Sequence, residues 1–134
     1  MESLTNFVTS YSQTTGYAIE ALACLARRRP DSMLVREIAS ETEIPLPYLS
    51  KIFQRLAEAG IVESKRGYKG GVRLTREPDA ISLLEINMAA ESGRSDTTEE
   101  SPRPGTFWQA FHQSYRDKLA AMTLADVVEY EVHA

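Results

Sequence analysis

Polar and basic side chains share one face of the segment at residues 47–59, and their types suit hydrogen bonding to bases and phosphates. Apolar residues recur there with helical spacing, which predicts an amphipathic helix that begins at Pro47 and ends at Gly60. No acid interrupts the opposite face, which carries Tyr48, Ser50, Lys51, Gln54 and Arg55. Lysine and arginine donate to guanine edges in a major groove, and hydroxyls bind bases or phosphates. The pattern indicates either a nucleic-acid contact or a solvated helix face.

A second basic cluster follows, between two segments typical of short β-strands at residues 61–64 and 71–75. The loop between them combines cations with glycines, which allow a sharp turn and a close approach to another backbone. The cations that could neutralise phosphates or enter a minor groove are Lys65, Arg66, Lys69 and Arg73. We interpret this segment as the wing of a winged helix, and the alternative is a solvated basic hairpin.

Two helices upstream would position these residues. The polar run at residues 12–15 precedes apolar residues at helical spacing, which predicts a first helix over residues 15–28. Pro30 ends that helix, and the apolar spacing at residues 34–39 predicts a short second one. Prolines at positions 45 and 47 prevent one continuous helix through the next connection. Two short helices joined by a tight connection predict a helix-turn-helix arrangement.

A fourth helix, a loop and a long last helix are predicted after the hairpin. Ser82 suits the N-cap of the fourth helix, and Glu85 holds the third position of a capping box. Residues 91–105 are polar, acidic and proline-containing, which indicates a loop. The helix over residues 106–122 carries a wide apolar stripe of Phe107, Trp108, Phe111, Tyr115, Leu119 and Met122. We expect this stripe to form a two-fold dimer interface rather than only to pack on its own domain, and Thr123 to cap a final turn.

Length and composition favour one globular unit. The 134 residues are 43% hydrophobic and 25% charged, and we expect a mainly α fold with a small β-hairpin wing. A winged helix-turn-helix would occupy residues 10–78, and a linker loop and dimerisation helix would occupy residues 79–134. The net charge is −4, yet residues 27–76 hold eleven basic and six acidic side chains, a local charge of +5. The basic charge is therefore concentrated where nucleic acid would bind.

Other classes of protein find little support. No apolar run approaches the roughly 18 residues of a membrane helix, and the first ten residues do not resemble a signal peptide, so a cytoplasmic location is expected. Cys24 is the only cysteine, which leaves no internal disulfide and no thiolate cage from one chain. We expect no cofactor, no metal site and no enzyme activity, because no nucleophile–base pair, phosphate-binding loop or metal-ligand spacing occurs.

The stretch LVREIASETEIPLPYLSKIFQRLAEAGIVESKRGYKGGVRL, residues 34–74, closely resembles the winged helix of the Rrf2 family of bacterial transcription regulators. The polar run at residues 12–15, followed by Tyr17 and Ala18, resembles that family's entry to its first helix. Residues 107–128 resemble its dimerisation helix and closing segment. The resemblance implies DNA contacts by Ser12, Gln13 and Thr15 at a helix end, by Tyr48, Ser50, Lys51 and Arg55 on the recognition helix, and by Arg66, Gly67, Lys69, Gly70 and Gly71 in the wing.

The sequence departs from the family's pattern at the sensor. Cluster-binding members hold three cysteines between the fourth helix and the dimerisation helix, whereas residues 91–105 contain neither cysteine nor histidine. The usual cluster ligands are therefore absent. The few other candidate ligands are interpreted as surface residues: His112, His133, Glu91, Asp96, Glu99 and Glu100.

Three functional hypotheses follow. The leading one is a homodimeric, sequence-specific repressor that binds double-stranded DNA through the helix at residues 47–59 and the wing at residues 62–75. Its signal would be a small-molecule effector near the dimer interface. A second hypothesis keeps the DNA binding and adds redox or metal sensing by unusual or intersubunit ligands. In the third, a winged helix serves protein interaction, and the basic face docks on an acidic partner.

Overall fold

The computed structural model describes residues 2–65, 70–92 and 104–133. Its helices and strands, in chain order, are α1 (Glu2–Arg27), α2 (Val35–Thr42), α3 (Leu46–Glu58), β1 (Val62–Lys65), β2 (Gly71–Leu74), the 3-10 turn η1 (Pro78–Ala80), α4 (Leu83–Ala90), α5 (Phe107–Ala121) and α6 (Leu124–His133). The predicted mainly α fold with a two-stranded hairpin is confirmed.

Helix α1 is much longer than predicted. The expected start at Thr15 is wrong, because the helix already begins at Glu2. Serine and threonine favour the N-cap position of a helix when their hydroxyl groups form hydrogen bonds with the nearby backbone. Here the Thr15 hydroxyl lies inside the fold and bonds instead to Asn87 and Glu91 of the α4 region. A long-range partner thus replaces the local one that the sequence pattern suggested.

Helices α2 and α3 form the predicted helix-turn-helix. The Glu37 carboxylate accepts the Leu34 amide at 2.8 Å and so caps the first turn of α2. The helix ends at Thr42, and its C-cap Glu43 adopts a left-handed conformation with φ of 62°. Pro47 lies in the first turn of α3, where its missing N–H removes no helical hydrogen bond. All four apolar positions of the predicted inner face of α3 are buried: Leu49, Ile52, Phe53 and Leu56.

Strands β1 and β2 pair antiparallel in the predicted wing, with Val62 opposite Leu74 and Lys65 opposite Gly71. Met33, just before α2, adds an isolated bridge to β2. Its amide donates to the Val72 carbonyl at 3.0 Å, and its carbonyl accepts the Val72 amide at 2.7 Å. The backbone of the wing is therefore joined to the start of the helix-turn-helix.

The C-terminal elements begin with the predicted capping box. The Ser82 hydroxyl accepts the Glu85 amide at 3.1 Å, and the Glu85 carboxylate accepts the Ser82 amide at 3.2 Å. Thr106 caps α5 by accepting the Gln109 amide. The final turn expected after Thr123 is in fact α6, a helix of ten residues.

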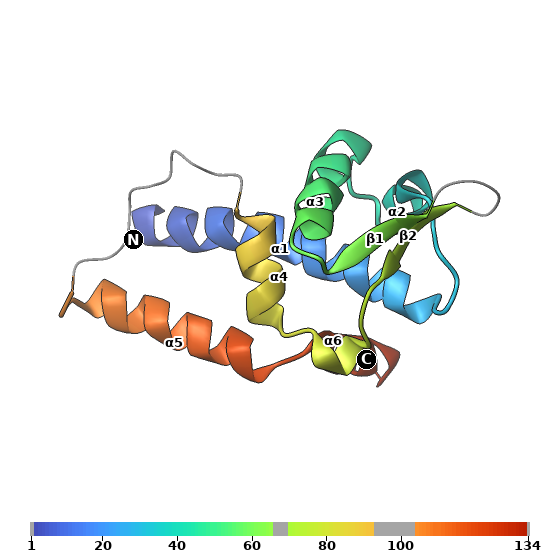
Figure 1. Cartoon of the computed structure of the whole chain (residues 1–134). Helices are drawn as coiled ribbons and strands as arrows, with labels where there is room; N and C mark the ends of the chain where they lie inside the picture. Colours follow the sequence, from blue (N-terminus) through green and yellow to red (C-terminus); the bar gives the residue numbers. More distant parts are fainter. Residues whose placement is uncertain (1, 66–69, 93–103, 134) are drawn as a thin grey trace.

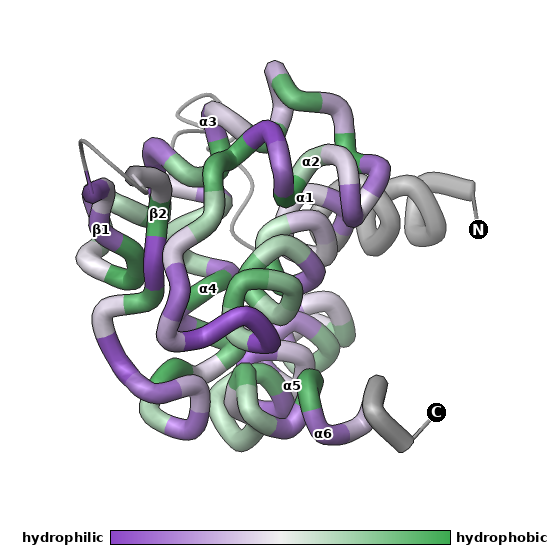
Figure 2. Tube along the Cα trace, turned by 90° about the vertical axis from the view of Figure 1, so that its right-hand side faces the viewer, coloured by the Kyte–Doolittle hydropathy of each residue, from purple (hydrophilic) through white to green (hydrophobic). Residues whose placement is uncertain are grey.

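Helix α4 occupies the centre of the molecule, with α1 and α3 on one side and α5 on the other (Figure 1). One apolar core joins the elements and includes Leu22 of α1, Ile52 of α3, Ile86 of α4 and Leu124 of α6. Figure 2 shows the β1–β2 hairpin at the edge of the molecule, with hydrophilic residues on both strands. Among the described residues, no helix is both long and apolar enough to cross a membrane.

Candidate nucleic-acid interface

The outer face of α3 presents the residues predicted to contact bases. Tyr48 is 55% exposed, and Ser50 and Lys51 are also exposed. These residues alternate with the buried positions of the same helix, because the 3.6-residue period separates the two faces. The described residues include no hydrogen-bond or ion-pair partner of Lys51, so its ammonium group is available to a ligand.

The predicted contacts on α1 and α3 meet through Tyr17. The rings of Tyr17 and Tyr48 pack edge to face, with centroids 5.9 Å apart and an interplanar angle of 73°. The Gln13 amide donates to the Tyr17 hydroxyl at 3.3 Å. Tyr17 was not among the residues predicted to form this surface. Its position four residues after Gln13 was the available signal, since residues at that spacing lie on one helix face.

Two other predicted residues of α1 contribute differently. Thr15 is only 2% exposed, and its hydroxyl accepts the Asn87 amide at 2.9 Å and donates to the Glu91 carboxylate at 3.2 Å. Its side chain therefore holds α1 against α4 in this structure. Ser12 lies in α1, but its side chain is outside the described part of the molecule.

The wing contributes one described free cation at its base. Lys65 is exposed at the end of β1, opposite Gly71. Arg73, by contrast, donates to the Glu63 carboxylate across the hairpin at 2.7 Å, which partly neutralises its charge. The predicted contacts Arg66, Gly67 and Lys69 lie outside the described residues, and Gly70 is half-buried.

Gly71 has a structural task at the base of the wing. Its φ is +138°, and a Cβ atom there would lie 2.3 Å from the Met33 carbonyl oxygen. Glycine permits both this backbone conformation and the close approach of the two strands. The residue thus sets the position of the wing relative to the start of α2.

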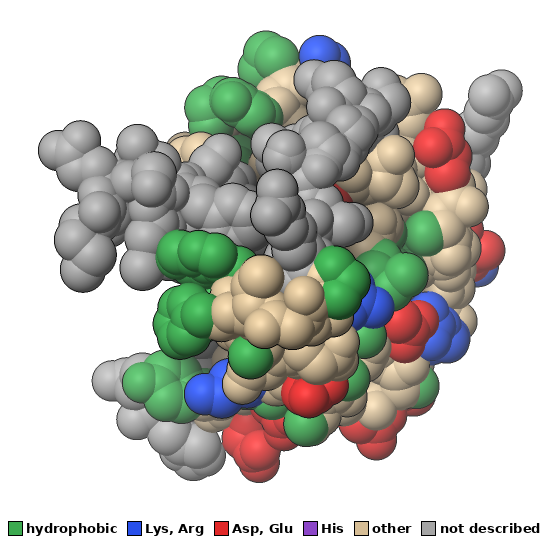
Figure 3. Space-filling model, turned by 90° about the vertical axis from the view of Figure 1, so that its left-hand side faces the viewer, with side chains coloured by type: hydrophobic (Ala, Val, Ile, Leu, Met, Phe, Trp, Pro, Cys, Tyr) green, Lys and Arg blue, Asp and Glu red, His purple; other side chains and the backbone are tan. Residues whose placement is uncertain are grey.

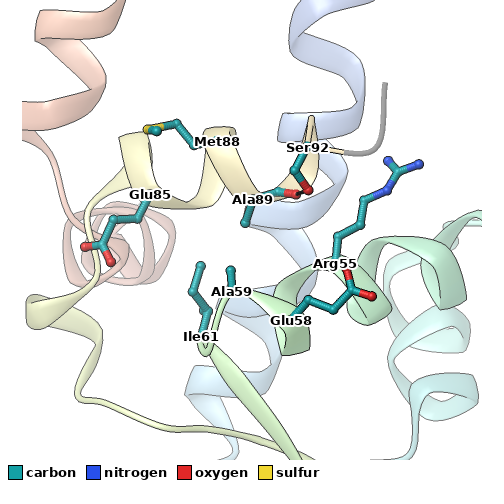
Figure 4. Close-up of a pocket in the computed structure, with 8 residues that line it drawn as sticks. All are labelled: Arg55, Glu58, Ala59, Ile61, Glu85, Met88, Ala89 and Ser92. Carbon is teal, nitrogen blue, oxygen red and sulfur yellow. Dashed lines mark hydrogen bonds between the residues drawn. The ribbon is translucent and has the colours of Figure 1, made fainter. Parts of the chain in front are cut away.

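Arg55 points away from the outer face of α3. Its guanidinium donates to the Ala90 carbonyl at 2.9 Å, and Figure 4 shows the side chain alongside the C-terminal end of α4. A groove of about 420 Å³ adjoins this contact, between α3 and α4. Apolar side chains including Ile61 and Met88 line it, with the carboxylates of Glu58 and Glu85 beside them.

An aromatic cluster marks the start of α5. Phe107 packs against Trp108 and Phe111, with ring centroids 5.3 and 6.2 Å away. These rings stay 68%, 41% and 37% exposed, respectively. Figure 3 shows hydrophobic side chains gathered on this face. The C-terminal half of the predicted stripe is covered more by the chain itself. Leu119 is buried and Tyr115 packs against the chain's own core, whereas Met122 is exposed.

This arrangement, a helix-turn-helix followed by a β-hairpin wing, defines the chain as a winged-helix DNA-binding protein of the kind that regulates transcription. Residues 11–130 match the Rrf2 family, described as an iron-dependent transcriptional regulator. The chain belongs to this family. It is a transcription regulator rather than an enzyme.

Related proteins agree with this assignment. A Synechocystis sp. protein, provisionally classed as an HTH-type transcriptional regulator, is 36% identical over 125 residues, which cover 83% of this chain and 82% of that protein. An Aquifex aeolicus protein of the same provisional class is 42% identical over 76 residues, but the match spans only 53% of that protein. The structure of CymR, the global cysteine regulator of B. subtilis, superposes with a TM-score of 0.72 at 27% identity and covers 87% of this chain and 94% of that one.

The described residues do not fit the iron in the family's description. Within the described ranges, no three histidine, cysteine or carboxylate side chains lie together as metal ligands. Cys24 is buried in α1, where its thiol donates to the Glu41 carboxylate at 3.6 Å. Burial and the nearby Glu41 charge raise the pKa of this thiol, which disfavours the thiolate that binds iron. The acids Asp96, Glu99 and Glu100 lie outside the described residues.

Proposed function

We propose that the protein is a homodimeric repressor that binds its operator with α3 in the major groove and with the β1–β2 wing on the adjoining backbone. The observation that carries this proposal is the contact of Gln13, Tyr17 and Tyr48, which joins the middle of α1 and the first turn of α3 into one polar surface beside the free Lys51. A helix face of this kind fits the width of a major groove. The need to reach DNA also supports a cytoplasmic location.

The proposed contacts divide into two kinds. Tyr48, Ser50 and Lys51 would read base edges, because they stand on the outer face of the recognition helix. Lys65, Arg66 and Lys69 would bind phosphates, with Gly67 and Gly70 allowing the loop to approach the backbone. Gln13, with Ser12, would contact DNA from the middle of α1.

Dimerisation would place two such surfaces on one operator. The exposed rings of Phe107, Trp108 and Phe111 support α5 as the two-fold interface, since burying them removes apolar surface from water. Residues 10–78 would then form the DNA-binding unit and residues 79–134 the assembling unit. Two recognition helices related by a two-fold axis read half-sites roughly 34 Å apart, one helical turn of DNA.

We further propose a small-molecule effector that binds near the dimer interface. The central position of α4, which contacts α5 on one side and α1 and α3 on the other, supports this idea. A ligand that alters the packing of α5 would act on the DNA-binding elements through α4. Genes under control of this protein would then respond to the concentration of that molecule.

The proposal is tested by DNA-binding titrations. Genomic fragments retained by the protein would first define a preferred duplex, and affinities for it and for a scrambled duplex would be measured at several salt concentrations. Counterion release predicts a steep loss of affinity with added salt, with a slope that falls by about one unit for each phosphate contact removed.

Three lysine variants make the test specific. Lys51→Ala should cost roughly 1–3 kcal/mol on the preferred duplex and much less on the scrambled one, as the loss of a base contact does. Lys65→Ala should weaken both duplexes equally. Lys118→Ala removes an exposed lysine of α5 that belongs neither to the proposed DNA-binding surface nor to the aromatic cluster of the proposed dimer interface, and it should change neither affinity. Weak, salt-independent binding by the wild type would refute the proposal and favour the acidic-protein partner.

A further inference from the structure

Three hydrogen bonds converge on the last turn of α4, at residues 87–91. Arg55 of α3 donates to the Ala90 carbonyl at 2.9 Å. Asn87 donates to the Thr15 hydroxyl of α1 at 2.9 Å, and Thr15 donates in turn to the Glu91 carboxylate at 3.2 Å. One turn of one helix thus holds both of the helices that carry the proposed DNA contacts.

The chemistry of these hydrogen bonds explains why they stabilise the arrangement of the three helices. The last carbonyls of a helix have no intrahelical donor, and the negative end of the helix dipole attracts a cation, so the Arg55 guanidinium is a favourable cap for α4. Asn87 and Thr15 are both only 2% exposed, and a buried polar pair is strongly destabilised when one partner is lost. The three bonds therefore favour one arrangement of α1, α3 and α4.

We propose that Arg55 is a positioning residue rather than a base-reading one, and that the last turn of α4 sets the position of the recognition helix relative to α1. This inference rests on the proposed DNA-binding function. Because α4 also contacts α5, the same turn is the element through which a change at the dimer helix reaches the DNA-binding surface. Figure 4 shows the Arg55 side chain rising from α3 beside Ser92, just past the last turn of α4.

The salt dependence of DNA binding separates a positioning role of Arg55 from a direct phosphate contact. Arg55→Met keeps the length of the side chain and removes its charge, and Lys51→Met is the matched change at a proposed direct contact. We expect Arg55→Met to lower affinity for the preferred duplex about tenfold with an unchanged salt slope, because no phosphate contact is lost. Lys51→Met should also leave the salt slope unchanged, because Lys51 is proposed to contact bases. Lys65→Met is the positive control for a lost phosphate contact, and it should lower the salt slope by about one unit.

Hydrogen exchange without DNA tests the same contact independently of the function. The amides of Glu91 and Ser92 bond to the Asn87 and Ala89 carbonyls in the last turn of α4. We expect them to exchange several-fold faster in Arg55→Met than in the wild type and to remain unchanged in Lys51→Met. Arg55→Lys, whose ammonium can still donate to Ala90, should recover slow exchange and part of the DNA affinity.

Thr15→Val provides the second variant if Arg55→Met does not fold. It removes the hydroxyl that links Asn87 to Glu91 at nearly constant volume, and it should speed exchange at the same amides without changing the salt slope. Wild-type exchange in Arg55→Met would overturn the inference: an unchanged salt slope would then make Arg55 a base contact, and a lower slope a direct phosphate contact. Faster exchange in a protein that fails to bind DNA would refute the proposed function but support the coupling of α3 to α4.

Discussion

Replacing the exposed phenylalanines of α5 by alanine should dissociate the proposed dimer without unfolding its subunits. Phe107 is 68% exposed in the single chain, so alanine there removes little of the subunit's own packing, whereas Phe111 is 37% exposed and its replacement also removes contacts within the subunit. Tyr130 of α6 is a matched control, because it is an aromatic residue that is 75% exposed outside this cluster. Leu119 is unsuitable for the test, since it is buried in its own subunit and its loss would lower stability directly.

The exposed areas fix the expected order of effects. A phenylalanine side chain presents about 150 Å² or more, so the 68% exposure of Phe107 amounts to roughly 100 Å². At about 25 cal/mol per Å², its complete burial contributes about 2.5 kcal/mol per subunit and about 5 kcal/mol per two-fold dimer. The same reasoning gives about 3 kcal/mol per dimer for Phe111 at 37% exposure. The dimer dissociation constant should therefore rise roughly 10³- to 10⁴-fold for Phe107→Ala and about 10²-fold for Phe111→Ala.

Sedimentation velocity over a range of protein concentrations measures these constants, and thermal melting checks that the subunits stay folded. We expect Tyr130→Ala to dimerise like the wild type. Operator affinity should fall in parallel with dimerisation, because a monomer loses the effective concentration that its partner supplies. Dimers of unchanged strength in both phenylalanine variants, or a larger effect from Tyr130→Ala, would place the interface elsewhere.

Three further predictions concern the wing, the capping box and iron. Gly71→Ala should lower the free energy of unfolding by at least about 1–3 kcal/mol in chemical denaturation, because of the positive φ at this position and the clash of a Cβ atom with the Met33 carbonyl. Gly16→Ala is the control: this glycine lies in α1 with open space around it, so alanine should raise stability by roughly 0.5–1 kcal/mol. The hydrogen bond from Arg76 lowers the pKa of Glu85 below its ordinary value of 4.5. The ionised Glu85 carboxylate therefore contributes to folding stability above pH 4.5, and this contribution is lost as the pH falls through the lowered pKa. Glu85→Gln should be at most about 1 kcal/mol less stable than the wild type near neutrality and equally stable in acid. Protein purified without oxygen should be colourless, with Cys24 as its single thiol, and stoichiometric iron and sulfide by chemical assay would contradict this expectation.

Local patterns predicted the elements whose structure depends on local chemistry. The capping box of Ser82 and Glu85 involves residues three apart, and it marked the start of α4 to the residue. The inner face of α3 followed from its helical period, and the wing followed from glycines and cations between two short strands. In each case the signal and the structure depend on neighbours within a few positions along the chain.

The sequence is least informative where partners distant in sequence decide the structure. Thr15 looked like a cap, but its partners Asn87 and Glu91 lie more than 70 positions away. The helical spacing of α3 places Arg55 at the border between its buried and exposed faces, and only the folded chain brings the Ala90 carbonyl within hydrogen-bonding distance. Glu43 takes a left-handed conformation that favours glycine, and the sequence gives no sign of it there. These are the positions at which tertiary contacts outweigh local preference.

The two halves of the proposed interface are fixed by different kinds of contact, and this difference limits how regulation can work. The wing is joined to the start of α2 by backbone hydrogen bonds between Met33 and Val72, at 2.7 and 3.0 Å, and Gly71 allows their close approach. No change of a side-chain contact releases those bonds, so the wing and the helix-turn-helix should move as one body. The middle of α1, in contrast, is positioned by side chains, through the Tyr17 ring and the Thr15 hydroxyl. A signal that arrives through α4 acts on these side-chain contacts, and we therefore expect it to shift α1 relative to the recognition helix while the wing keeps its place.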